Sequence, residues 1–367
     1  MISQRAQNIV ASVTGELSAK VTELKAQGKD VIKLNIGEPD FRPPENIAEA
    51  AVAAIEEGFS KYVAIPGIIE LRKAICTKLE KDNHLVYSPN EICVSTGAKQ
   101  AVMNALMALC DPGDEVIIPT PCWVSYSEMV KLTGAAPVFV PCKAETGFAL
   151  NVDDIAAAVT PHTKAIIICT PNNPTGNDLN HDEIEKILDT FQGIVVVDEA
   201  YSDFTHRRAF RYELSDHPNM IVLNTMSKAW ALAGVRLGMA FASKEIIDVF
   251  NKVKYPYNIN ILTQKEAFKA FENAMEVSKW VSTIILERNR MMEAFKMLPS
   301  CKQVFHSDAN FFLAKMTDAD RIYRYLVNEG IIVRNRSKVT LCRDCLRITV
   351  GAKSENNELL SALRVLE

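Results

Sequence analysis

Short apolar runs recur along residues 92–223, each followed by a polar loop, and they constrain the fold of this 367-residue chain most strongly. Helical stretches separate several of these runs, and each run has the length of one strand. Strands that are apolar throughout and alternate with helices are typical of a parallel sheet that is buried on both faces. The sequence therefore predicts an α/β fold, a three-layer αβα domain with a mainly parallel sheet. The expected strands cover residues 92–95, 115–118, 165–169, 194–198 and 220–223.

The pattern changes after about residue 264. A long amphipathic helical stretch is followed by short expected strands at 310–314, 331–334 and 346–350, with helices between them. This pattern predicts a smaller α+β domain, which the N-terminal segment joins. We expect residues 1–41 to form an N-terminal arm and part of the small domain, residues 42–268 the large domain, and residues 269–367 the small C-terminal domain.

Bulk properties exclude several classes of protein. The net charge of −4 provides no basic surface for nucleic acid or an anionic membrane, and no apolar run approaches the length of a membrane span. The first residues lack the apolar core of a signal peptide, and the odd count of 9 cysteines favours a reducing, cytoplasmic location. Cys342 and Cys345 form the one close cysteine pair, which is a weak zinc signal, and we predict no metal site.

Lys228 follows the run at 220–223 in a segment that also holds Thr225, Ser227 and Arg236. This set suits a covalently bound aldehyde cofactor that carries a phosphate, because the amine can bind the aldehyde while the hydroxyls and the guanidinium bind the phosphate. Lysine and arginine after a strand often only solvate a loop. For this segment alone, both interpretations stay open.

Three further polar residues follow expected strands. Asp198 ends an apolar run, where a carboxylate is costly unless it is paired, and a protonated pyridine nitrogen is a suitable partner; the alternative is a helix cap. Asn173 could bond a cofactor ring hydroxyl or serve only its turn, and Tyr201 is a second possible donor. Ligands bind at the carboxyl ends of strands in such sheets, so we expect these residues to converge.

Other candidates carry similar alternatives. Gly97, Ala98 and Lys99 open an expected helix, whose free backbone N–H groups can bind a phosphate. Trp123 could stack on a flat ring or be a partly buried core aromatic. The two arginines of the expected small-domain strands suit bidentate binding of a carboxylate or phosphate, although surface ion pairs are the usual role of arginine. These arginines are Arg334 and Arg347.

Together these residues resemble the fold-type I, class I/II aminotransferases that use pyridoxal 5′-phosphate. The resemblance covers nearly the whole chain. Residues 1 to about 175 resemble bacterial aspartate aminotransferases of the 1b group, whereas residues from about 171 onward resemble histidinol-phosphate aminotransferases. The motifs that carry it are GEPDF at 37–41, GAKQ at 97–100, NNPTG at 172–176, DEAY at 198–201, SKAW at 227–230, AGVRLG at 233–238 and LRIT at 346–349.

The resemblance implies a role for each matched residue. Lys228 binds the cofactor aldehyde and carries a proton during transfer, Asp198 pairs with the pyridine nitrogen, and Trp123 stacks on the ring. Asn173 and Tyr201 bond the ring hydroxyl, and Tyr201 is counted with Lys228 and Asp198 as catalytic. The implied phosphate ligands are Gly97, Ala98, Thr225, Ser227 and Arg236.

Tyr62 resembles the tyrosine that reaches the phosphate of a neighbouring subunit, which implies a homodimer with shared sites. Arg347 is implied to hold the substrate α-carboxylate, with the Gly37 backbone and Asn173 nearby.

The two resemblances imply different amino donors. Lys99, which also lies beside the cofactor, matches the lysine that 1b aspartate enzymes use against a distal carboxylate. Arg334 and Arg347 match the arginine pair that histidinol-phosphate enzymes use on the substrate phosphate. We predict transamination between aspartate and 2-oxoglutarate by a ping-pong mechanism. A histidinol-phosphate aminotransferase is the alternative, and a pyridoxal-phosphate decarboxylase or lyase is the further one.

Overall fold

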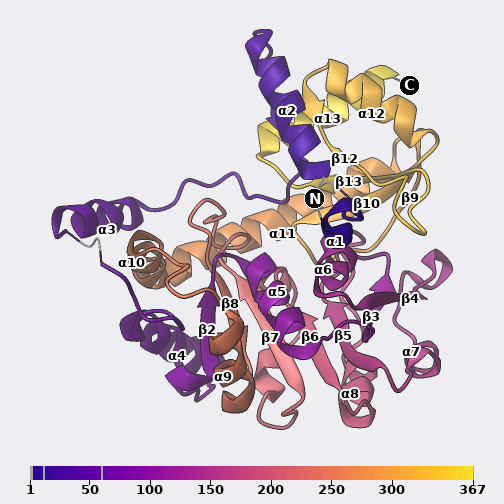
Figure 1. Ribbon diagram of the computed structural model, residues 1–367. Helices are drawn as coiled ribbons and strands as arrows, with labels where there is room; N and C mark the ends of the chain where they lie inside the picture. Colours follow the sequence, from indigo (N-terminus) through magenta and orange to yellow (C-terminus); the bar gives the residue numbers. More distant parts are fainter. Residues whose placement is uncertain (1–2, 11–12, 59–60, 367) are drawn as a thin grey trace.

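Seven strands form the large sheet of the computed structural model, which describes residues 3–10, 13–58 and 61–366 (Figure 1). Their order is β2-β8-β7-β6-β5-β3-β4. All neighbouring strands are parallel except at β8, which is antiparallel to both β2 and β7. The strands are β2 (Ile92–Ser95), β3 (Glu115–Thr120), β4 (Ala136–Pro141), β5 (Thr163–Cys169), β6 (Ile194–Asp198), β7 (Met220–Thr225) and β8 (Gly238–Phe241).

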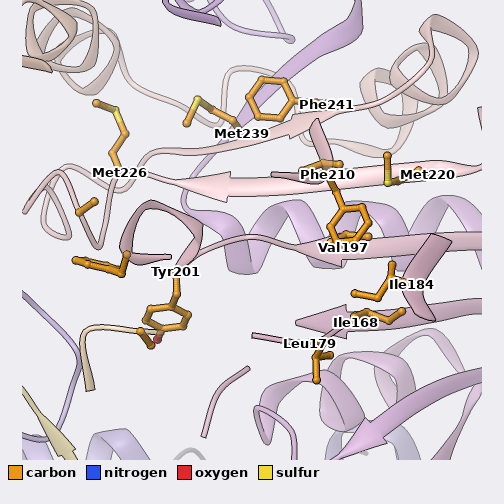
Figure 2. Packing of buried hydrophobic residues seen from close by; sticks show 14 of the residues in the cluster. Ile168, Leu179, Ile184, Val197, Tyr201, Phe210, Met220, Met226, Met239 and Phe241 are labelled. Atoms are coloured by element: carbon orange, nitrogen blue, oxygen red, sulfur yellow. The ribbon is translucent and has the colours of Figure 1, made fainter. Parts of the chain in front are cut away.

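Alternate residues of these strands face two separate apolar cores. In β6, Val195 and Val197 belong to one core and Val196 to the other. Figure 2 shows Val197 near Ile168 and Ile184 in the first of them. This arrangement confirms the predicted three-layer αβα fold with a mainly parallel sheet. The first core includes residues of α4 (Ile69–Asn83), α7 (Val152–Ala158), α8 (His181–Thr190) and α10 (Ile261–Ala270), and the second includes residues of α5 (Ala98–Leu109), α6 (Ser125–Thr133) and α9 (Lys244–Val253).

A second, antiparallel sheet has the order β12-β13-β10-β9. Its core, which includes Phe312 and Leu346, is separate from the two cores of the large sheet. The elements here are β9 (Cys301–Val304), β10 (Phe311–Met316), β12 (Arg334–Asn335), β13 (Cys345–Thr349), α12 (Ala319–Asn328) and α13 (Lys353–Leu366).

One long helix, α11 (Ala274–Lys296), connects the two parts of the molecule (Figure 1). Trp280 and Ile284 near its start pack in a core of the large sheet, whereas Met291 and Phe295 near its end pack in the core of the small sheet. The helix therefore fixes the position of one sheet relative to the other.

The N-terminal segment also reaches the C-terminal part of the chain. Ile32 of β1 (Ile32–Lys33) pairs in parallel with Ile331 of β11 (Ile331–Ile332). Leu24 packs against Ile332 in a small cluster of its own. The boundaries at residues 41 and 268 stay a prediction. The N-terminal helices are α1 (Gln4–Gln7), α2 (Val13–Ala26) and α3 (Glu45–Glu56), and the short 3-10 helices are η1 (Pro89–Glu91), η2 (Ala144–Thr146), η3 (Ser202–Phe204), η4 (Phe210–Glu213) and η5 (Phe271–Asn273).

The five strands expected between residues 92 and 223 are present, but three described strands of the seven-stranded and four-stranded sheets were not expected. In β4, Pro137 and Pro141 obscure the strand pattern, and an edge strand tolerates their missing N–H groups. β8 has four residues and begins with a glycine, and β9 contains Lys302 and Gln303 and is only partly buried. Among the described residues, no helix combines the length and hydropathy needed to cross a bilayer.

Candidate active site

A cavity of about 410 Å³ lies at the carboxyl ends of β5, β6 and β7, a volume typical of small-molecule sites. The strand order brings together polar residues that are far apart in the sequence. Most of the predicted site residues line this cavity. They are Ala98, Lys99, Trp123, Asn173, Asp198, Tyr201, Thr225, Ser227, Lys228, Arg236, Arg334 and Arg347.

Asp198 is buried at the end of β6 and accepts two hydrogen bonds. Tyr126 Oη lies 2.6 Å from Asp198 Oδ2, and the backbone N–H of Ala200 donates to Oδ1 at 3.0 Å. Burial raises the pKa of Asp198, while these two hydrogen bonds oppose the shift. Both donors are neutral, so the carboxylate can still accept a cationic partner from the cavity.

Lys228 follows β7 and directs its amine toward the N-terminal segment. Its Nζ donates to the carbonyl oxygens of Ile36 and Gly37, each at 3.3 Å. Burial, followed by the charge of Arg347, lowers the pKa of Lys228 to about 8. An amine with this pKa is neutral in about one molecule in ten at pH 7. Lys228 can therefore act as a nucleophile near neutral pH.

A group of donors with the geometry of an anion site surrounds the start of α5. Thr225 Oγ1 lies 3.0 Å from Ser227 Oγ, and Arg236 Nη1 lies 3.5 Å from the same oxygen. Gly97 precedes the first residue of α5, and the first turn of this helix has no acidic side chain. The free N–H groups there favour a phosphate. Arg236 is exposed, so this anion site is open to solvent on one side.

Two glycines permit the close packing of this anion site. A Cβ atom at Gly97 would lie 2.5 Å from Arg236 Nη2. A Cβ atom at Gly238 would lie 2.3 Å from the backbone nitrogen of Ala98, where little can move. The glycine that begins β8 therefore allows this strand to lie directly against the start of α5.

Arg347 of β13 approaches the cavity from the small sheet. Its Nη1 donates to Asn173 Oδ1 at 2.9 Å, and its Nη2 donates to the carbonyl oxygen of Asn35 at 2.7 Å. Arg334 pairs with Arg347 across the β12–β13 ladder. Burial lowers the pKa of Arg347 to about 10 and raises the pKa of Tyr201 to about 12. This end of the cavity is strongly cationic and suits an anionic group of a substrate.

Lys99 and Trp123 form another part of the wall. Lys99 Nζ lies 5.2 Å from the centre of the Trp123 ring, and Trp123 packs edge-on against Tyr126 with ring centres 5.2 Å apart. Burial, followed by the charge of Arg236, lowers the pKa of Lys99. The Trp123 ring is placed where it can contact a flat ligand in the cavity.

Three predicted site residues do not line the cavity. Gly97 packs against Arg236, which lines the cavity. The carbonyl oxygen of Gly37 accepts from the amine of Lys228, which also lines it. Tyr62 lies elsewhere and is 83% exposed, with its ring stacked on that of Tyr257 at 4.3 Å between centres.

Sequence reasoning missed six residues that line the cavity, and Tyr126 and Arg336 are the two whose side chains bear on its chemistry. The other four are Asn35, Ile36, Cys169 and Ala200. Tyr126 lies inside α6, and its partner Asp198 is 72 residues away, so no local motif identifies it. Arg336 stands two residues after Arg334, and the alternation of side chains in an extended segment could have revealed it. Cys342 and Cys345 are buried and do not line the cavity.

The sequence profile of the family described as "Aminotransferase class I and II" matches residues 29–366 of the chain. The histidinol-phosphate aminotransferase of Bacteroides fragilis is 44% identical over 288 residues, which cover 78% of this chain and 83% of that protein. The histidinol-phosphate aminotransferase of Bacteroides thetaiotaomicron is 43% identical over 293 residues, which cover 80% and 83%.

Solved structures of aspartate aminotransferases are similar over the full length. The enzyme of Thermus thermophilus with maleate has a TM-score of 0.88 at 29% identity and covers 100% of both chains. The enzyme of Thermotoga maritima has a TM-score of 0.89 at 29% identity and covers 100% of this chain and 99% of that chain.

Proposed function

The chain belongs to the class I and II aminotransferases, which use pyridoxal 5′-phosphate, and we propose that its amino donor is histidinol phosphate and its acceptor 2-oxoglutarate. One observation carries the choice of donor. Three arginines line one end of the cavity, whereas Asp198 is the one carboxylate among the described lining residues. Such a cationic end matches a phosphate group. The arginines are Arg334, Arg336 and Arg347.

The two Bacteroides relatives, both histidinol-phosphate aminotransferases, support the same donor, whereas the similar solved structures are aspartate aminotransferases. The alignment to the Bacteroides fragilis enzyme spans 288 residues, which is more than the segment from residue 171 to the end. The likeness to a histidinol-phosphate aminotransferase therefore extends into the first half of the chain. The aspartate donor expected from the sequence is accordingly the second candidate, and Lys99 is the observation that favours it.

The residues of the cavity fit pyridoxal 5′-phosphate. Asp198 is a buried carboxylate whose two hydrogen-bond donors are neutral, which suits a protonated pyridine nitrogen. The donors around the start of α5 suit the phosphate, with Arg236 supplying the positive charge. When bound, the cofactor supplies an aldehyde and an electron-accepting ring.

We assign the following roles to the protein. Lys228 supplies the amine that holds the cofactor and then moves a proton at the substrate carbon, for which its lowered pKa is suited. Asp198 keeps the cofactor nitrogen protonated, and Trp123 contacts the ring face. Asn173 and Tyr201 orient the ring from its hydroxyl side; Asn173 Nδ2 lies 3.5 Å from Tyr201 Oη.

The donor is tested by steady-state kinetics with histidinol phosphate and with aspartate, each with 2-oxoglutarate as the acceptor. The carbonyl product of each donor is identified, which is a ketone from histidinol phosphate and a 2-oxo acid from aspartate. We expect histidinol phosphate to give the highest kcat/KM, and Arg334→Gln to lower that value roughly ten- to a hundredfold, because a charge-assisted hydrogen bond is lost. Arg343→Gln is the matched control, since the Arg343 side chain is 93% exposed. A preference for aspartate that Lys99→Ala removes would replace our proposal with the second candidate, and carbon dioxide release would favour a decarboxylase.

We also propose a homodimer in which Tyr62 of one copy completes the phosphate site of the other. The open side at Arg236 and the exposure of Tyr62 outside its own cavity support this arrangement. We expect Tyr62→Phe to weaken cofactor binding several-fold while sedimentation still gives a dimer. A monomeric wild-type protein in sedimentation experiments would contradict it. Phenylalanine retains the stacking on Tyr257, so the variant isolates the hydroxyl.

A further inference from the structure

Arg336 is a buried arginine of the cavity that no described residue neutralises. It follows β12 directly, is 7% exposed, and lines the cavity together with Arg334 and Arg347. Its backbone N–H donates to the carbonyl oxygen of Cys345 at 2.8 Å, which fixes the start of its side chain beside β13. The position of Arg336 is therefore set by the sheet and not by a surface loop.

The guanidinium of Arg336 has unused donors. Its Nε is buried without a hydrogen-bond partner, and in the part of the chain that the structure describes its side chain forms no hydrogen bond or ion pair. In Arg347 the Nε is also buried without a partner, but both Nη atoms have one, because Asn173 Oδ1 and the carbonyl oxygen of Asn35 accept from them. A buried cation without a partner is costly, so the binding of an anion at Arg336 is favourable.

Among the described residues, none of the groups that act on Arg336 is an acidic side chain. Burial, followed by the charges of Arg347 and Arg334, lowers the pKa of Arg336, and its other polar neighbours are the Cys342 thiol and the Tyr201 hydroxyl. Arginine nevertheless stays protonated in proteins. A ligand with two negative charges therefore relieves this repulsion more than a ligand with one.

We propose that Arg336 is a third anion-binding arginine, which makes this end of the cavity prefer a doubly charged phosphate to a singly charged carboxylate. Arg336 is thereby a specificity-determining residue for the donor. The donor part of this inference rests on the proposed function, because histidinol phosphate brings a phosphate to the arginines. The preference for a dianion is a property of the cavity and can be measured without any donor.

The test uses two tetrahedral anions that differ in charge. Sulfate carries two charges and methanesulfonate one, and both are titrated into the holoenzyme, whose bound cofactor already fills the other phosphate site. Calorimetry is expected to show tighter binding of sulfate. In Arg336→Gln, sulfate affinity should fall roughly ten- to a hundredfold and methanesulfonate affinity much less. Arg343→Gln, an exposed change between β12 and β13, should leave both affinities unaltered.

A second variant separates charge from packing. Arg336→Lys keeps the charge, so it should retain most of the preference for sulfate, and thermal unfolding monitors the integrity of each variant. An unchanged sulfate preference in folded Arg336→Gln would overturn the inference. If the wild type does not use histidinol phosphate but Arg336→Gln still loses its sulfate preference, the proposed donor fails and the third arginine site stands.

Discussion

Replacing Lys228 with alanine is expected to abolish the near-visible absorbance of the covalently held cofactor and all transamination. The amine of Lys228 is the group that the geometry places between the cavity and the carbonyl oxygens of Ile36 and Gly37. Without it, the cavity loses the amine that is placed to bind the aldehyde and to carry the proton at the substrate carbon. Absorbance spectra of the protein with added cofactor, together with single-turnover assays, measure the two losses.

The control is Lys252→Ala, which removes an exposed lysine and should leave the spectrum and the rate unchanged. The Lys228→Ala protein should still bind the cofactor non-covalently, because Asp198 and the anion site around α5 are intact. Turnover that survives in this variant would refute the assignment of Lys228.

Asp198→Asn is expected to lower kcat/KM roughly a hundred- to a few thousandfold, because breaking a buried charge pair costs about 3–5 kcal/mol. The asparagine is almost the same size, but it no longer carries the charge that keeps the cofactor nitrogen protonated. If the amide nitrogen of the asparagine takes the position of the oxygen that now accepts from Tyr126 Oη at 2.6 Å, two donors face each other. Steady-state kinetics with the best donor measure the effect.

A graded variant identifies the cause. Tyr126→Phe removes one hydrogen bond and keeps the carboxylate, so its loss should be roughly ten- to a hundredfold. Asp216→Asn removes an exposed carboxylate and should have no effect. If Asp198→Asn retains a rate within about tenfold of the wild type, the charge of Asp198 is not required for the reaction.

Much of the fold was predictable because burial leaves a direct trace in the sequence. The strand ending at Asp198 is apolar because both of its faces are covered, and this holds for the neighbouring strands that end near Asn173 and Lys228. The convergence of their polar ends followed from the rule for parallel sheets. Strand β8 escaped prediction because its role is set by Gly238, whose packing on Ala98 is a long-range contact.

Most residues of the candidate site were predictable because they lie in short sequence motifs. Tyr126 could not be predicted, because the hydrogen bond to Asp198 depends on how α6 packs on the sheet. The choice of donor also depended on three-dimensional placement. Lys99 is conspicuous in the sequence, but the fold places it over Trp123, whereas Arg336 joins two other arginines at one end of the cavity.

The segment that follows β1 is held by residues of β13, and this bears on when the cavity can form during synthesis. The carbonyl oxygens of Ile36 and Gly37 contact Lys228, and the Gly37 N–H donates to Thr349 Oγ1 at 3.0 Å, across 312 residues of sequence. Arg347 likewise donates to the carbonyl oxygen of Asn35, which lies 312 residues earlier in the sequence. A nascent chain that ends before β13 lacks one wall of the cavity, so the substrate site can form only after β13 has been synthesised.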